Sequence, residues 1–160
     1  MKSTLVHAAR VLIRVQESRF KSACLHSQRV AFFALLLAKE LGLGEKYQRR
    51  VYLAGLLHDI GKIGIPDFIL LKRGKLTAEE WEEIKKHPVF GYEILSTVPG
   101  MKEISLMVLH HHERYDGTGY PAGLAAQDIP LGARILAVAD SFDAMTTERV
   151  YRPFPLSRKE

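Results

Sequence analysis

The chain has 160 residues, of which 47% are hydrophobic and 26% charged, so it suits one folded domain and is not disordered. A formal net charge of +5 favours a phosphate-bearing ligand, but no basic run interleaved with aromatic residues indicates duplex nucleic acid. No apolar run approaches the roughly 18 residues that span a membrane, and no signal peptide is recognised.

Helical periodicity dominates the chain, and no stretch has the alternation and turn signals of a strand. In chain order, we expect helices within residues 3–21, 24–44, 45–61, 77–87, 88–100, 101–114 and 131–148. The first of them is interpreted as a core or linker helix and not as a helix on a membrane surface. Cys24, the only cysteine, opens the second; an internal disulfide is excluded, which favours a reducing cytoplasm.

Several helices carry apolar residues at helical spacing, and these stripes predict the core. The expected core positions are Leu5, Ala8, Leu12 and Val15 in the first helix, His26, Val30, Phe33 and Leu37 in the second, and Ile135, Val138, Phe142 and Met145 in the last. The best-marked start is a capping box of Thr77 and Glu80, with Leu76 and Trp81 placed for a hydrophobic staple. Pro88 ends that helix, because the residue before a proline avoids the helical conformation.

Three consecutive histidines precede a glycine-rich loop in "HHHERYDGTGYP", residues 110–121. Adjacent helical residues point about 100° apart, so three in a row cannot face one site. The stripe expected to face the core comprises Ile104, Val108, His111, His112 and Tyr115. His110 lies off this stripe and is interpreted as an ordinary helix-end or surface histidine.

A second polar cluster is "HDIGK", where His58 and Asp59 follow an apolar stretch and Lys62 lies four residues after His58. Burying an acid beside an imidazole is unfavourable unless a partner such as a metal ion compensates. Asp140 and Asp143 share a stripe of small residues on the last helix, where two carboxylates could approach a neighbouring helix.

Each of these features has an ordinary explanation by itself, because a lone histidine on an apolar helix is usually a core residue and a glycine-rich loop can be any turn. Ordinary packing does not explain five histidines and two aspartates at interior helix positions. The five histidines are His26, His58, His87, His111 and His112. Imidazole and carboxylate ligands suit Fe, Mn, Zn or similar ions, and helical bundles build such sites from facing helices. We therefore predict a single all-α bundle with polar clusters at its helix ends and loops.

Four strings in order, "HDIGKIGIP", "HPVFGYEIL", "HHERYDGTGYP" and "ILAVADSFDAMT", resemble the HD-GYP family of the HD-domain phosphohydrolase superfamily. The resemblance runs from about His26 to Arg152. It implies an all-helical fold of the HD-domain type, with a metal site in the bundle and the Gly-Tyr-Pro loop at its mouth. The site would hold two or three metal ions, often iron or manganese, and hydrolyse cyclic di-GMP.

The resemblance also implies roles for individual residues. One metal would be held by His26, His58, Asp59 and Asp140, and Asp59 would bridge to a second metal held by His87, His111 and His112. Lys62 would help to stabilise the phosphoryl group during the reaction. The substrate-side positions would be Tyr120, Asp143, Arg149 and Arg152, of which the two arginines suit phosphate oxygens because guanidinium groups donate in pairs.

Two departures from the family pattern refine these expectations. Ser22 stands where members with a third metal carry a glutamate, so we expect two divalent ions, Fe or Mn first and Zn, Ni or Mg as alternatives. Opening of the ring to linear pGpG is then better supported than complete hydrolysis to GMP. The chain ends where relatives continue through further helices, and it carries no receiver or sensor domain. Two interpretations stay open: a fragment of a longer protein, with such a domain upstream, or an unusually short member of the family.

The expected organisation is one domain over residues 1–160, with residues 1–20 as an N-terminal helix or linker and the family's C-terminal helices missing. Uncovered apolar surface would then favour a homo-oligomer. The leading functional hypothesis is a cytoplasmic cyclic di-GMP phosphodiesterase in bacterial second-messenger signalling. An HD-type hydrolase of another nucleotide or cyclic dinucleotide is the first alternative, and a non-catalytic binding or docking module that keeps the fold is the second.

Overall fold

A computed structural model describes residues 2–19 and 21–147, with side chains described for residues 5–19 and 25–147. Within these ranges the chain is helical and contains no strand, so the all-α prediction is confirmed. The elements are α1 (Lys2–Arg19), α2 (Lys21–Glu40), α3 (Glu45–Leu57), η1 (Ile60–Gly64), α4 (Asp67–Leu70), α5 (Ala78–Ile84), α6 (His87–Ser96), α7 (Lys102–Leu109), η2 (Ala126–Asp128) and α8 (Leu131–Thr146), where η denotes a short 3₁₀ helix.

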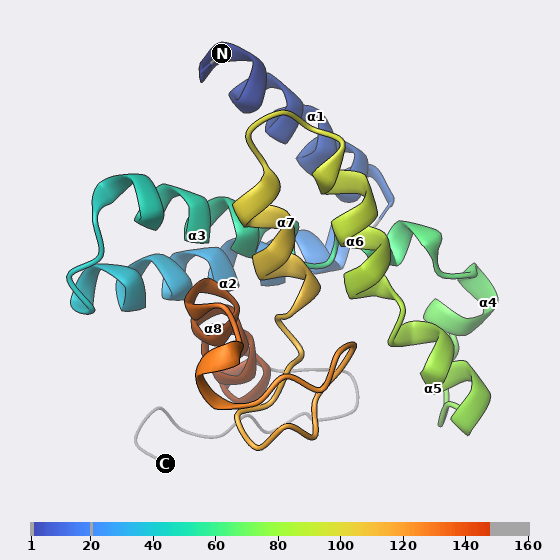
Figure 1. Ribbon diagram of the computed structural model, residues 1–160. Helices are drawn as coiled ribbons and strands as arrows, with labels where there is room; N and C mark the ends of the chain where they lie inside the picture. Colours follow the sequence, from blue (N-terminus) through green and yellow to red (C-terminus); the bar gives the residue numbers. More distant parts are fainter. Residues whose placement is uncertain (1, 20, 148–160) are drawn as a thin grey trace.

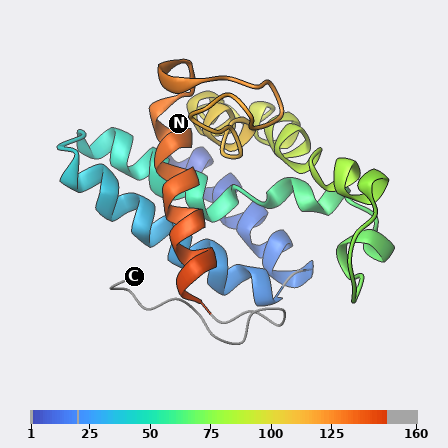
Figure 2. The ribbon, with the colours of Figure 1, turned by 90° about the horizontal axis from the view of Figure 1, so that it is seen from below.

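Two antiparallel helix pairs and one crossing helix make up the bundle. α2 and α3 form the first pair, α6 and α7 form the second, and α8 lies across α2 (Figures 1 and 2). α1 packs against the first pair and η1, whereas α4 and α5 project to one side of the molecule (Figure 1). No helix among the described residues is both long and apolar enough to cross a bilayer.

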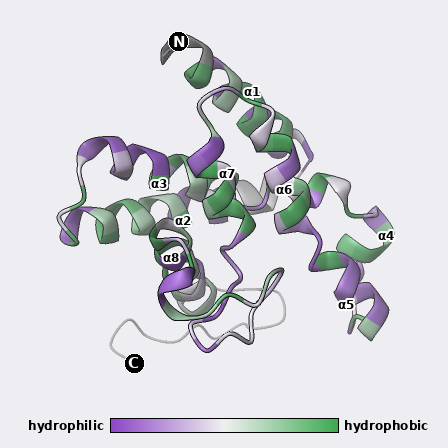
Figure 3. Ribbon diagram, in the orientation of Figure 1, coloured by the Kyte–Doolittle hydropathy of each residue, from purple (hydrophilic) through white to green (hydrophobic). Residues whose placement is uncertain are grey.

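The core lies where α2, α3, α7 and α8 meet. Its fully buried residues include Val30, Ala34, Val51, Leu57, Ile104, Val108 and Leu136. The ribbon of α7 is hydrophobic over most of its length, whereas the outer end of α3 and most of α5 are hydrophilic (Figure 3). Burial of this apolar surface supplies the main stabilisation, at about 25 cal/mol per Å².

Glycines allow the backbones to approach closely at two junctions. A Cβ on Gly55 of α3 would lie 2.6 Å from the Ala31 Cα of α2. Because glycine has no Cβ, the backbones of the first helix pair can come into contact there. A Cβ on Gly61 of η1 would lie only 1.9 Å from the carbonyl oxygen of His87. Any side chain at Gly61 would therefore push the start of α6 away from the segment that carries Asp59.

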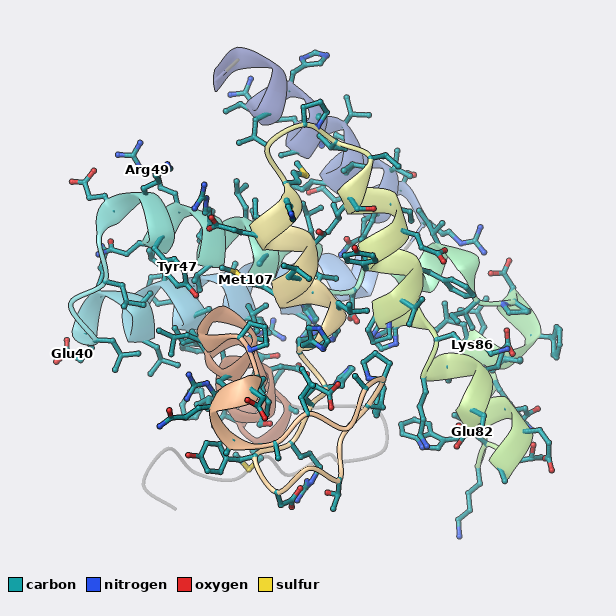
Figure 4. All side chains as sticks on the ribbon, in the orientation of Figure 1. Glu40, Tyr47, Arg49, Glu82, Lys86 and Met107 are labelled. Atoms are coloured by element: carbon teal, nitrogen blue, oxygen red, sulfur yellow. The ribbon has the colours of Figure 1, made fainter. Side chains whose placement is uncertain are left out.

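Two predicted stripes are correct in part, because Leu5, Ala8 and Leu12 of α1 and Ile135 of α8 pack in or against the core. Val15 of α1 is exposed while Gln16 is buried, and in α8 Val138 and Met145 are exposed. The buried residues of α8 are Gly132, Ala133, Ile135, Leu136, Ala139 and Asp143. α8 is apolar on more than one face, so the period alone could not choose between them; tight packing against neighbouring helices selects the face with small residues. Gly132, for example, leaves room for the side chain of Met107, which lies where α7 approaches α8 (Figure 4).

The helix boundaries confirm some expectations and correct others. Thr77 accepts from the Glu80 backbone and Glu80 accepts from the Thr77 backbone, so the capping box is confirmed. The helix expected to continue to residue 114 ends at Leu109, and Tyr115 is exposed instead of facing the core. The helix expected to reach residue 61 ends at Leu57 and gives way to η1.

Candidate metal centre

The polar residues predicted to bind metal come together from helices that are far apart in sequence. His26 lies in α2, Asp140 in α8, and His87 is the first residue of α6. The remaining ligands, His58, Asp59, His111 and His112, directly follow the ends of α3 and α7. Helix ends thus deliver most of the cluster.

Three of the histidines also cap the helices that precede them. The Nδ1 of His58 lies 2.8 Å from the Gly55 carbonyl oxygen, that of His87 lies 2.8 Å from Ile84, and that of His111 lies 2.6 Å from Val108. The last carbonyls of a helix lack intrahelical partners, and a side-chain donor satisfies them. Because Nδ1 donates its proton in each case, the lone pair on Nε2 is left to face the cluster.

The Nε2 atoms of His87 and His111 are buried, and neither has a hydrogen-bond partner among the described residues. An imidazole acceptor that is buried without a partner is unfavourable by about 1–3 kcal/mol. A bound cation would supply the missing partner. The donor set therefore fits a metal ion.

The ligand atoms form three overlapping groups, each with its atoms within 4.8 Å of one another. The groups are His87, His111 and His112; His26, His58 and Asp140; and His58, Asp59 and His111. The Asp59 carboxylate lies between the first two, with one oxygen 3.5 Å from the His87 Nε2 and the other 3.5 Å from the His58 Nε2. This is the arrangement that a bridging ligand requires.

Asp59 is ionised in spite of its burial. Burial would raise the pKa of its carboxyl, but the Lys62 ammonium and the nearby His58 and His87 outweigh that effect and hold the pKa well below its usual range. The Lys62 Nζ lies 2.7 Å from one Asp59 oxygen. The Lys62 side chain is partly exposed, so its ammonium lies at the edge of the buried cluster.

The imidazoles differ in their affinity for protons. Burial lowers the pKa of His87 to about 4 and that of His112 to about 3, and burial lowers the pKa of His111 well below its usual value. These three are therefore neutral near pH 7, the form that binds metal. Burial also opposes the charged form of His26, but its hydrogen bonds to Asp140 and Asp143 outweigh burial and raise its pKa.

The structure places Asp143, which the resemblance assigns to the substrate side, next to His26 and Arg29. Its carboxylate is 1% exposed, and it accepts from the Nδ1 of His26 at 2.7 Å and from the Nε of Arg29 at 2.5 Å. Burial would raise the pKa of Asp143, and the Arg29 and His26 contacts instead lower it. Both carboxylate oxygens of Asp143 are engaged behind His26, so Asp143 is placed to orient that imidazole.

The sequence analysis missed Arg29. A weak signal was available, because Arg29 lies one helical turn after His26, on the side of α2 that faces α8. Its guanidinium donates to both oxygens of Asp143, at 2.5 and 3.1 Å. Arg29 thus completes a chain of contacts that runs from the surface through Asp143 to His26.

Tyr120 of the Gly-Tyr-Pro loop lies beside the cluster. Its ring centroid is 4.9 Å from that of His112, and the Lys85 ammonium lies 5.8 Å from the Tyr120 centroid. Burial, with smaller effects of Asp59 and Asp140, raises the pKa of the Tyr120 phenol, which therefore stays protonated and can donate. Arg149 and Arg152 lie outside the described residues, and so does the side chain of Ser22.

The HD domain family matches residues 10–157, nearly the whole chain. The chain belongs to the HD domain family. Its four strings, together with relatives named as cyclic di-GMP phosphodiesterases, identify it with the HD-GYP branch of that family.

Curated relatives of this HD domain act on cyclic dinucleotides. The chain is 48% identical over 143 residues to the cyclic di-GMP phosphodiesterase response regulator RpfG of Xanthomonas campestris, covering 88% of this chain and 38% of that protein. It is 44% identical over 155 residues to a cyclic di-GMP phosphodiesterase of Thermotoga maritima, covering 95% and 42%. It is 41% identical over 148 residues to the 3'3'-cGAMP-specific phosphodiesterase 1 of Vibrio cholerae, covering 92% of this chain and 34% of that protein. The HD domain thus spans less than half the length of these relatives.

Solved structures share the fold. Bd1817, an HDG"Y"P protein of Bdellovibrio bacteriovorus, matches with a TM-score of 0.65 and 26% identity, over 78% of this chain and 41% of that one. The HD domain of the L. monocytogenes phosphodiesterase PgpH, solved with cyclic-di-AMP, matches with a TM-score of 0.67 and 22% identity, over 89% and 76%. The second likeness supports the fold alone.

Proposed function

We propose that this HD domain is a metal-dependent phosphodiesterase that hydrolyses cyclic di-GMP at two adjoining divalent ions. The observation that carries the proposal is the position of Asp59 between two groups of buried and partly buried histidines, with its two oxygens 3.5 Å from the Nε2 atoms of His58 and His87. The family resemblance makes iron or manganese the first candidate, with zinc, nickel or magnesium as alternatives, and a mixed imidazole and carboxylate set suits ions of this kind.

The chain's residues divide between two metal positions. His26, His58 and Asp140 would hold one ion, His87, His111 and His112 would hold the other, and Asp59 would be shared. Bound divalent ions supply a water of lowered pKa as nucleophile and offset negative charge on the phosphoryl oxygens.

The protein itself positions the substrate and supplies further charge. The Lys62 ammonium, 2.7 Å from Asp59, is placed to offset charge that develops on the phosphoryl oxygens during hydrolysis. The flat, partly buried ring of Tyr120 beside His112 offers a nucleobase a stacking surface and a neutral hydroxyl donor. Arg149 and Arg152 are predicted to bind the substrate phosphates in pairs of charge-assisted hydrogen bonds.

The second candidate substrate is 3'3'-cGAMP, because relatives specific for that dinucleotide are 41% and 42% identical to this chain. Both candidates share the phosphodiester ring and differ in one nucleobase. A cytoplasmic location, linear pGpG as the first product, an upstream regulatory domain and self-association remain predictions of the sequence.

A panel assay with metal-loaded protein tests the proposal. Cyclic di-GMP, 3'3'-cGAMP, cyclic di-AMP and bis(p-nitrophenyl) phosphate would each be incubated with iron- or manganese-loaded protein, and products would be separated by chromatography. We expect turnover of cyclic di-GMP to the linear dinucleotide, with the highest kcat/KM of the panel. Turnover of 3'3'-cGAMP alone would move the substrate to the second candidate. Hydrolysis of none of the three cyclic dinucleotides would refute the proposal.

A further inference from the structure

Glu113 follows the two metal-site histidines, and the sequence analysis gave it no role. Its side chain is fully buried, with 0% of its surface exposed. The backbone N–H of Ala122 donates to one carboxylate oxygen at 2.7 Å, and that of Leu124 donates to the other at 3.1 Å. His110 adds a longer contact at 3.4 Å. A buried carboxylate needs such partners, and here two of them come from the far side of the Gly-Tyr-Pro loop.

The rest of the loop packs directly on the backbone beside Glu113. A Cβ on Gly119 would lie 2.3 Å from the backbone nitrogen of Arg114, so only glycine fits there. The next residue, Tyr120, donates its N–H to the carbonyl oxygen of His112 at 3.2 Å. Tyr120 is therefore held between the close contact at Gly119 on one side and the Glu113 anchor on the other.

The outer part of the loop has its own support. The exposed carboxylate of Asp116 accepts from the backbone and hydroxyl of Thr118 and from the guanidinium of Arg114. These contacts shape the turn at the tip, but they do not reach residues 120–124. Among the described side chains, Glu113 is the one that ties residues 122 and 124 to the segment that carries His111 and His112.

We propose that Glu113 is a positioning residue that holds the loop so that Tyr120 keeps its place beside His112. Through this contact Glu113 determines how well a cyclic dinucleotide is recognised, and it has little influence on cleavage of a small phosphodiester at the metal centre. This inference rests on the proposed function, because the selectivity concerns the same site.

The variant Glu113→Gln tests the anchor with almost no change in shape. It replaces one acceptor oxygen with an amide donor, so one of the two backbone N–H groups loses its partner and faces a second donor. We expect amide hydrogen exchange at Ala122 and Leu124 to accelerate by about tenfold or more, because the loop opens more readily. The KM for cyclic di-GMP should rise by about tenfold.

Other readouts separate positioning from general damage. Bound metal should match the wild type, and kcat/KM for bis(p-nitrophenyl) phosphate should fall by less than about threefold. Glu45→Gln is the matched control, since Glu45 is an exposed glutamate at the start of α3 that pairs with Arg49. It should change none of these quantities. Glu113→Asp, which keeps the charge but withdraws the oxygens, replaces the Gln variant if that variant does not fold.

The outcomes are distinct. A raised KM for cyclic di-GMP with faster exchange at Ala122 and Leu124 supports the positioning role. Unchanged hydrogen exchange and an unchanged KM overturn the proposal. An equal fall in kcat/KM for cyclic di-GMP and bis(p-nitrophenyl) phosphate, or a loss of bound metal, also overturns it, because Glu113 would then support the metal centre itself. If the wild type hydrolyses no cyclic dinucleotide, the proposed function fails, and the exchange at the two amides then decides alone whether Glu113 holds the loop.

Discussion

Asp59 lies between the two groups of candidate ligands, and its neighbour Lys62 is proposed to add charge without binding metal. Asp59→Ala removes a ligand that both ions would share, so we expect metal content to fall well below two per chain and activity to be lost. Lys62→Ala should leave metal content near the wild-type value and slow turnover by about 10²- to 10³-fold, the usual effect of removing one stabilising donor. Elemental analysis with turnover assays would check both, and retention of two ions by Asp59→Ala would refute the bridging role.

In the proposed site Arg29 would not contact the metal. It contacts Asp143, which in turn contacts the candidate ligand His26. Arg29→Met keeps the length of the side chain but removes the donors to Asp143, so the orientation of His26 loses support. We expect metal affinity at the His26 position to weaken by about 10- to 100-fold, as is typical when such an orienting contact is lost.

Arg49→Met is the matched control for this experiment. Arg49 projects from the outer part of α3, far from the cluster, where it pairs with Glu45 at 2.6 Å (Figure 4). Its replacement should leave metal affinity unchanged in a chelator-competition titration. Wild-type affinity in Arg29→Met as well would show that the Asp143 contact has no bearing on metal binding.

At the level of helices, the contact between η1 and α6 holds together the segments that carry the candidate ligands Asp59 and His87. Gly61→Ala would place a Cβ 1.9 Å from the His87 carbonyl oxygen and 2.4 Å from the Gly91 nitrogen, both of them backbone atoms. The segments must separate, so we expect a loss of about 2–3 kcal/mol in the free energy of unfolding and weaker metal binding.

Gly74→Ala provides the comparison, since a Cβ there meets nothing within 4 Å. That variant should change stability by no more than about 0.5 kcal/mol. Urea unfolding of both variants measures the difference. Equal stabilities would mean that η1 and α6 can move apart at no cost, against the packing described above.

Element boundaries also show what could be predicted from the sequence. The capping box at Thr77 is a local signal and was predicted correctly. The end of α7 at Leu109 was not predicted correctly, because apolar periodicity indicates which face of a helix is buried and not where the helix ends. The structure supplies the reason: the His111 side chain donates to the Val108 carbonyl, which a continuing helix would have used for a backbone N–H.

At the level of the whole molecule, the motif strings and their order were enough to predict the fold class. They also predicted a set of candidate metal ligands that the structure brings together. The side chains that Asp143 contacts could not be predicted from the motif strings. Its partners His26 and Arg29 lie 117 and 114 residues away in sequence, and the contact depends on the rotation of α8 against α2. The small-residue stripe with Asp140 and Asp143 was predicted to approach a neighbouring helix, but the stripe alone did not indicate which helix or which side chains it would meet.

The buried imidazoles make the stability of the metal-free protein depend on pH. The pKa of His87 is about 4 in the folded chain and 6.5 without perturbation, and that of His112 is about 3, so the unfolded chain binds more protons between these values. Their stabilisation is complete above about pH 6.5 and is lost as pH falls toward 4. His26, whose pKa is raised, acts in the opposite direction and offsets part of the loss. Thermal unfolding of the metal-free protein should show a falling Tm from pH 7 to 4.5, and a constant or rising Tm would contradict the buried, neutral state of these histidines.

We propose that two ions bound around Asp59 make this HD domain a cyclic dinucleotide phosphodiesterase. The most direct test titrates metal-free protein anaerobically with iron or manganese while the rate of cyclic di-GMP hydrolysis and the bound metal are measured in the same samples. We predict that the rate rises with occupancy and reaches its plateau at two ions per chain. A chain that binds two ions and hydrolyses no cyclic di-GMP, or one that is fully active without bound metal, would contradict the account.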